Sequence, residues 1–285
     1  MGFLGLPSEL LSERQFEQEV TFLKEEEMSR ADALVAKGAY DQAIVLYLGA
    51  AQKSPLDEKL HVNMSYAFLH GRRFHEGISN LEDFLNNAEP HAVSFEIFMN
   101  LALLYKGLGE FGNALNSLRK AECKDRARVD LYLERADIQS HMGAHDDVIE
   151  TFTEAQLACG QSWRLHNAMG CYYNDVVGEH GLAILHFTLA KNSAPDEPTV
   201  YNNLGIAQVA AGSYAEAVEQ LSKAIKLAPD YCQAYHNLAV ALYKAHEYKR
   251  ASKVLEEVLG RFPEYAAANE FEDFLSHVLE LDNGK

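Results

Sequence analysis

The feature that most constrains this 285-residue sequence is an internal repeat with a period of 34 residues. The clearest copy occupies residues 198–231, and its pattern of large and small apolar residues recurs in residues 232–265. The matching residues are Tyr201, Leu204, Gly205, Ala217, Leu221, Ala224 and Pro229 in the first copy, and Tyr235, Leu238, Ala239, Ala251, Leu255, Val258 and Pro263 in the second. A fixed period of this length predicts a stack of small units, because one such unit cannot bury its apolar face alone.

The offsets of these residues resemble the tetratricopeptide repeat (TPR). The pattern continues toward the N-terminus, most clearly at Phe98, Leu101, Ala102, Tyr105, Gly109, Phe111, Ala114, Leu118 and Ala121. Gly77 replaces the usual alanine in the second copy, which is the weakest. Seven repeats are predicted, at residues 24–57, 58–94, 95–128, 129–162, 163–197, 198–231 and 232–265.

This resemblance implies an all-α fold, a right-handed superhelix (α-solenoid) of about seven helix-turn-helix repeats. Small residues would lie where two helices cross closely, and large residues would fill the gaps between neighbouring helix pairs. The fifth repeat has one extra residue near 174–177, and the second has about three near 92–94. We expect a local change of superhelical pitch at both places.

The two ends of the chain are expected to cover the open faces of the stack. Residues 266–285 form a predicted capping helix and tail, in which Phe271, Phe274 and Leu275 recur at helical spacing among acidic residues. Residues 1–23 carry a looser apolar stripe. This segment either caps the first repeat or docks as a mobile amphipathic helix into a groove on the same or a neighbouring chain.

Composition excludes several classes of function. The 42 acidic against 25 basic side chains give a formal net charge of −17, which disfavours nucleic acid and strong binding to anionic membranes. No apolar run approaches the length of a membrane-spanning helix. The four cysteines are spaced 36, 12 and 61 residues apart, without a paired motif, which predicts a reduced, cytoplasmic protein.

The usual catalytic motifs are absent from the sequence. It contains no glycine-rich phosphate loop, no G-x-S-x-G and no H-E-x-x-H. We therefore predict a non-enzymatic protein without cofactor or metal. A less favoured alternative is an enzyme or small-ligand sensor with its site near Asp130, Glu134, His166 and Cys171.

The resemblance also implies which residues face the concave groove, because the second, fifth, sixth and ninth places of each repeat lie there in this family. Asparagine occupies four of the seven sixth places, at Asn63, Asn100, Asn203 and Asn237. This spacing resembles the asparagine ladder of some protein glycosyltransferases and implies binding of a peptide backbone, since an amide both donates and accepts. Alternatively, asparagine is only a common consensus residue at this place.

The middle of the groove is predicted to be acidic. Asp130, Glu134 and Asp137 share one helical stripe in the fourth repeat, whereas the sixth and ninth places carry no basic residue that could form a carboxylate clamp. A lysine or arginine of the ligand would bind there, flanked by Asn100 and Asn167. Alternatively, Arg126, Arg128 or Arg164 pairs with these acids internally.

We therefore expect an adaptor or scaffold that holds an extended or helical segment of one or more proteins, with basic residues in that segment. The alternative is a homo-oligomeric scaffold that assembles through the N-terminal segment or the convex face. The predicted groove residues are Asn63, Tyr66, Asn100, Asp130, Glu134, Asp137, Asn167, Asn202, Asn203, His236 and Asn237.

Overall fold

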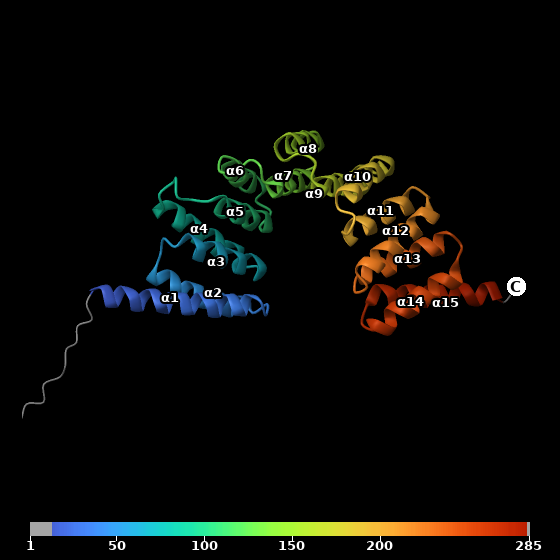
Figure 1. Cartoon of the computed structure of the whole chain (residues 1–285), viewed down its shortest axis with the longest axis horizontal. Helices are drawn as coiled ribbons and strands as arrows, with labels where there is room; N and C mark the ends of the chain where they lie inside the picture. The colour runs from blue at the N-terminus through green and yellow to red at the C-terminus, as the bar shows by residue number, and fades with distance from the viewer. Residues whose placement is uncertain (1–12, 284–285) are drawn as a thin grey trace, which may run out of the picture. The chain divides into compact units, whose positions relative to one another are not determined.

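The computed structural model describes residues 13–283, and every regular element in that range is helical (Figure 1). The all-α class and the helix-turn-helix organisation are thus confirmed. The helices are α1 (Glu13–Val35), α2 (Tyr40–Lys53), α3 (Glu58–His70), α4 (Phe74–Asn87), α5 (Phe95–Gly107), α6 (Phe111–Glu122), α7 (Val129–His141), α8 (His145–Cys159), α9 (Trp163–Cys171), the π-helix η1 (Tyr172–Val177), α10 (His180–Ser193), α11 (Pro198–Ala210), α12 (Tyr214–Leu227), α13 (Cys232–Lys244), α14 (Tyr248–Arg261) and α15 (Ala266–Asn283).

The chain folds as two compact units, divided between His145 and Asp146. We call them the N-terminal unit and the C-terminal unit. No shift in composition marks this point in the sequence, which lies in the fourth predicted repeat, at the first residue of α8.

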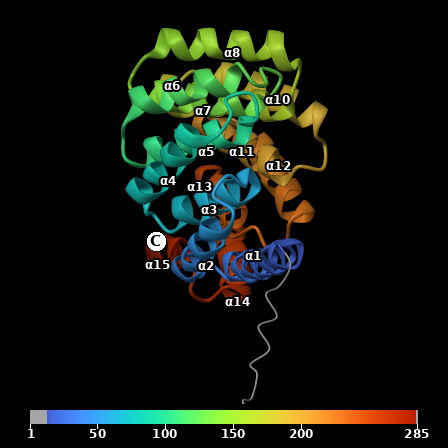
Figure 2. The same ribbon diagram turned by 90° about the vertical axis from the view of Figure 1, so that its left-hand side faces the viewer.

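In the N-terminal unit the helices pack in successive pairs. The helices of the first pair, α1 and α2, lie side by side in both views (Figures 1 and 2). Contacts also join α1 to α3 and α3 to α5, so the first helices of successive pairs form one continuous face. This face carries the candidate site.

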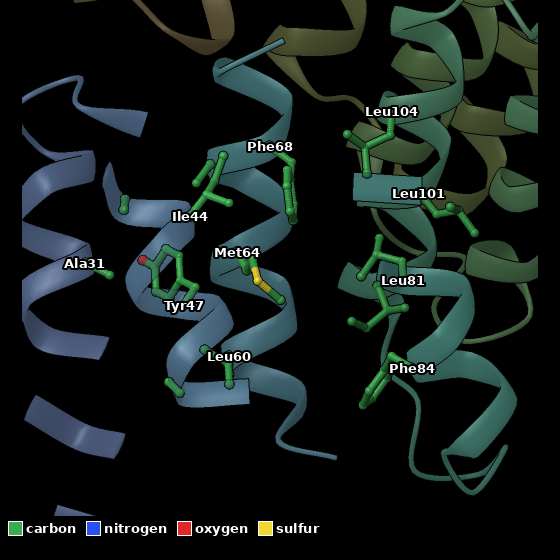
Figure 3. Close-up of a cluster of buried hydrophobic side chains, with 14 of the residues drawn as sticks. Ala31, Ile44, Tyr47, Leu60, Met64, Phe68, Leu81, Phe84, Leu101 and Leu104 are labelled. Atoms are coloured by element: carbon green, nitrogen blue, oxygen red, sulfur yellow. The ribbon is translucent and has the colours of Figure 1, made fainter. Parts of the chain in front are cut away.

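The core of this unit is built from the large apolar residues of the repeat. Ile44, Leu60 and Met64 are fully buried, and Figure 3 shows them with Tyr47, whose hydroxyl points toward α1. Full burial of one such side chain contributes about 1.5–3 kcal/mol. Packing between pairs therefore stabilises helices that would be marginal alone.

Glycine lies where the paired helices cross most closely, as the repeat pattern predicts. A Cβ atom added to Gly205 would lie 2.5 Å from Leu221, and one added to Gly170 would lie 2.6 Å from Phe187. Gly77, the departure in the weak second repeat, would bring a Cβ within 2.9 Å of Phe68 and Leu104. Glycine at position 77 is thus required by the close packing of its neighbours.

Both predicted insertions coincide with irregular structure. The extra residue of the fifth repeat falls in η1, where the wider π-helical turn absorbs one residue before Gly178 ends the helix with a positive φ of 77°. The extra residues of the second repeat lie in the 88–94 connection between α4 and α5.

The two ends differ in how well the predicted boundaries match the helices. Helix α15 coincides with the predicted cap, and its Ala268 and Leu275 are buried. Helix α1 passes continuously through the predicted boundary at residue 23, because the first helix of the first pair begins at Glu13. Residues 1–12 lie outside the described range. No helix in 13–283 combines the length and apolarity needed to cross a membrane.

Candidate functional site on the first helices of the N-terminal unit

A pocket of about 340 Å³ opens on the first-helix face of the N-terminal unit. It contains three of the predicted groove residues, Asn63, Tyr66 and Asn100, from α3 and α5. The complete lining is Asp32, Val35, Tyr47, Val62, Asn63, Tyr66, Glu96 and Asn100. We call this the α1–α3–α5 pocket.

Asp32 is the central carboxylate of the pocket. Its Oδ1 accepts hydrogen bonds from the Tyr47 hydroxyl and from Asn63 Nδ2, the latter at 3.2 Å. Burial and this interaction with Asp32 together raise the pKa of Tyr47 well above its usual range. Among the residues whose side chains the structure describes, no basic side chain pairs with Asp32 and no donor reaches its Oδ2.

The amide of Asn100 is held in one orientation by α3. Its Nδ2 donates to Ser65 Oγ at 2.7 Å and to the Val62 carbonyl at 3.3 Å. The Ser65 hydroxyl in turn donates to the Val62 carbonyl, so its oxygen can only accept from Asn100. Asn100 therefore uses its donors within the chain and keeps Oδ1 as an acceptor.

Glu96, the second carboxylate of the pocket, is paired within the chain. Arg128 Nη1 lies 3.1 Å from its Oε1, and the guanidinium stacks over the Phe95 ring. Burial opposes ionisation of Glu96, but hydrogen bonds from its own backbone amide, Arg128 and Ser94 hold its pKa below the usual range.

Tyr66 forms an aromatic wall of the pocket. Its side chain is 47% exposed, and its ring lies 4.1 Å from that of His70, measured between centroids. His70 also stacks on Tyr40 at 5.6 Å, so the Tyr66 ring is supported from behind. A large, pre-positioned and accessible ring of this kind is typical of residues that dominate binding energies.

The predicted acidic stripe has an internal cation that sequence reasoning missed. Lys106 Nζ lies 2.6 Å from carboxylate oxygens of both Glu134 and Asp137. Burial opposes protonation of Lys106, but these two acids raise its pKa overall. Lys106 stands near the end of α5, outside the four groove places that we projected. The stripe, which also includes the half-buried Asp130, is therefore a weaker candidate for binding a ligand cation than the sequence indicated.

In the C-terminal unit the predicted asparagines bind one another. Asn237 Nδ2 donates to Asn202 Oδ1 at 2.8 Å, Asn202 to Asn203 at 3.3 Å, and Asn203 to Asn167 at 3.1 Å. This asparagine chain joins the first helices α13, α11 and α9. We had expected Asn202 to face the groove. It is only 4% exposed, so its amide contributes to the packing of these helices instead.

His236 is half-buried. Its ring packs edge-on against Tyr265 and against Phe271 of α15, and burial lowers its pKa. The capping helix therefore covers part of the surface that this residue was expected to offer a ligand.

The residues of the alternative catalytic site have structural partners. His166 is buried, with its Nδ1 3.2 Å from His186 Nδ1 and its Nε2 2.5 Å from Gln161 Oε1. Burial raises the pKa of the Cys171 thiol to about 11, which disfavours a reactive thiolate. Among the described residues, no three His, Cys, Asp or Glu side chains are placed to hold a metal ion.

Comparison with known families identifies the repeat directly. A TPR-repeat model matches residues 207–245, and tetratricopeptide-repeat models match residues 232–261 and 95–122. No curated protein matches the sequence.

Similar solved structures include a tetratricopeptide-repeat protein from Parabacteroides merdae, 17% identical, with a TM-score of 0.62 over 89% of this chain and 99% of that one. The C-terminal part of a TPR protein from Cytophaga hutchinsonii is 17% identical, with a TM-score of 0.59 over 85% and 98%. YrrB, described as a TPR protein with an unusual peptide-binding site, is 16% identical, with a TM-score of 0.50 over 68% and 97%. These likenesses concern the fold.

Proposed function

Because this chain is a tetratricopeptide-repeat protein, we propose that it is a non-enzymatic adaptor that holds a segment of another protein against the first-helix face of its N-terminal unit. The observation that carries the proposal is the α1–α3–α5 pocket, which residues from three successive helix pairs line. The peptide-binding site reported for YrrB is consistent with this use of the fold.

The chemistry of the face favours an extended peptide. Asn63 and Asn100 offer amide oxygens to backbone N–H groups of a ligand, while Tyr66 and Val62 offer apolar surface to one side chain. Backbone hydrogen bonds with one aromatic anchor are typical of peptide recognition. No disulfide joins any of the four cysteines, all of which lie in the described part of the chain, and this supports a reducing compartment such as the cytoplasm.

The test is a selection of random peptides of about 12 residues, displayed on phage, against the full chain. The affinity of the selected peptides is then measured by fluorescence anisotropy for the wild type and for Tyr66→Ala. We expect the substitution to weaken binding about tenfold or more, because it removes the accessible ring of the pocket. Leu157→Ala is the matched control, since Leu157 is 85% exposed on α8 in the other unit.

Equal affinities of wild type and Tyr66→Ala would contradict this location of the site. Circular dichroism of each variant establishes that its helical content is unchanged. Because Tyr66 is exposed, we expect its loss to affect folding little.

Self-assembly is the second candidate, and one observation favours it. Phe22 and Leu23 are 65% and 42% exposed next to each other on α1. A helix that presents adjacent large apolar side chains can pair with a second copy. Light scattering during size-exclusion chromatography would then show a mass that falls to that of the monomer in Phe22→Ser/Leu23→Ser, whereas an unchanged monomer mass in the wild type would exclude this candidate.

A further inference from the structure

We propose that the α1–α3–α5 pocket binds one lysine or arginine side chain of the partner segment. The inference rests on the proposed function and specifies the ligand chemistry of the same face. It places the cation at Asp32, three helix pairs before the acidic stripe that the sequence indicated.

The first argument is the hydrogen-bonding character of the pocket. Asn100 has used its donors on Val62 and Ser65, and Asn63 donates to Asp32. What these groups still present is the Oδ1 atom of each amide and Oδ2 of Asp32. Such a set of acceptors is complementary to a ligand that carries several N–H groups, as ammonium and guanidinium do.

The second argument is the charge balance. Asp32 accepts hydrogen bonds only from neutral donors among the described residues, whereas Glu96 pairs with Arg128, and Glu134 pairs with Lys106. The pocket thus keeps one uncompensated negative charge. A ligand cation would neutralise it without breaking an existing ion pair.

The third argument distinguishes a side chain from a small inorganic cation. Val35 and Val62 line the pocket beside the exposed Tyr66 ring. These apolar groups can contact the methylene stem of lysine or arginine while the ring face attracts its charged end. A metal ion would instead need several converging carboxylate or imidazole ligands. The described part of the chain offers no such group of side chains here.

The test starts from peptides selected on the full chain. Each basic residue of a selected peptide is replaced in turn by its neutral isostere, norleucine for lysine or citrulline for arginine. At one position we expect the neutral isostere to weaken binding to wild type about tenfold, and to weaken binding to Asp32→Asn by less than about twofold. Asparagine at position 32 can still accept from Tyr47 and Asn63, so the local structure is preserved.

A matched control is needed because the net charge of −17 attracts any basic peptide. Glu26→Gln removes the same charge from an exposed position on the same helix, six residues before Asp32 and on another face. We expect the neutral isostere to weaken peptide binding to Glu26→Gln as much as it weakens binding to wild type.

The possible outcomes separate the two proposals. The cation proposal is overturned if the isosteres weaken peptide binding to Asp32→Asn and to wild type equally. It is also overturned if the selected peptides share no preferred basic position. The adaptor proposal survives that result if Tyr66→Ala still weakens binding about tenfold or more. If no peptide is selected at all, both proposals fail.

Discussion

In the N-terminal unit, Asn63 and Asn100 donate to groups of the preceding first helix and keep their amide oxygens available. In the C-terminal unit, Asn237, Asn202 and Asn203 bind one another in a chain that ends at Asn167. In both units the residue is asparagine and lies on the first helix of a helix pair. The use of the amide differs because its neighbour one repeat earlier differs.

This difference shows that one sequence pattern can leave an amide oxygen available in one unit and use it for packing in the other. Asn63, beside a carboxylate, and Asn100, beside a serine, donate to those neighbours, and the oxygen of each amide remains available as an acceptor. Asn202 and Asn203, which lie between other amides, each donate and accept within the chain of asparagines, and such chains of hydrogen bonds stiffen the helices that they join. Under the proposed function, the ligand contacts belong to the asparagines of the N-terminal unit, whereas those of the C-terminal unit join neighbouring repeats.

The largest expected effect is on stability, and it sharpens this assignment. Asn202→Ala removes a buried acceptor and donor, leaving the amide of Asn237 without its partner, so we expect a cost of about 2 kcal/mol. Asn63→Ala removes one partly exposed hydrogen bond and should cost less than about 1 kcal/mol. Hydrogen exchange with mass spectrometry measures each effect separately, on peptides from α11 and α3.

Equal costs for the two substitutions would contradict the division of roles. The fluorescence of Trp163, the only tryptophan, provides an independent measure of the C-terminal unit during chemical unfolding. We expect its transition to shift in Asn202→Ala and to stay in place in Asn63→Ala.

A second difference between the units is how their stability is expected to respond to acidic pH. His166, His186 and His236, whose pKa values burial lowers, all lie in the C-terminal unit. A lowered folded-state pKa means that the unfolded chain binds protons more readily. The stability contributed by these residues is therefore fully present above the ordinary histidine pKa of about 6.5 and is lost as pH falls through that value.

We accordingly expect acidification from pH about 7.5 to about 5.5 to speed hydrogen exchange in α9–α11 by roughly three- to tenfold, after correction for the intrinsic rate. Helices α3–α5 should change less. Burial raises the pKa of Glu272, so this carboxyl acts in the opposite sense and regains stability as pH falls toward its ordinary pKa of about 4.3. His186→Phe, which keeps a ring beside Tyr173, should reduce the acid response of the C-terminal unit alone.

These differences also explain how much could be predicted from sequence. The 34-residue period was sufficient to predict the helix pairs, the close crossing at Gly205 and the position of the extra residue in η1, since these depend on spacing within one repeat. The partner of Asn237 depends on the register between neighbouring first helices, which spacing within a repeat does not define.

A usable signal does exist in the sequence for some of these partners. Asn63 contacts Asp32, 31 residues earlier, and Asn237 contacts Asn202, 35 residues earlier. A polar residue about one period before an asparagine therefore predicts an internal partner. Lys106 gives no such signal, because a long side chain at the end of α5 reaches Glu134 across 28 residues.

The smallest expected effect tests the charge of Asp32 itself. Burial and the interaction with Asp32 raise the pKa of Tyr47, so this tyrosine stabilises the fold below its ordinary pKa of about 10 and the contribution is lost as pH rises through that value. In Asp32→Asn a neutral oxygen replaces the carboxylate, and the pKa of Tyr47 should fall while burial keeps it above normal. Titration of ¹³C-labelled tyrosine by NMR, with Glu26→Gln as the control, measures the change. If the pKa of Tyr47 were the same in Asp32→Asn and wild type, Asp32 would carry no effective charge beside Tyr47, and the pocket would have nothing to attract a cation.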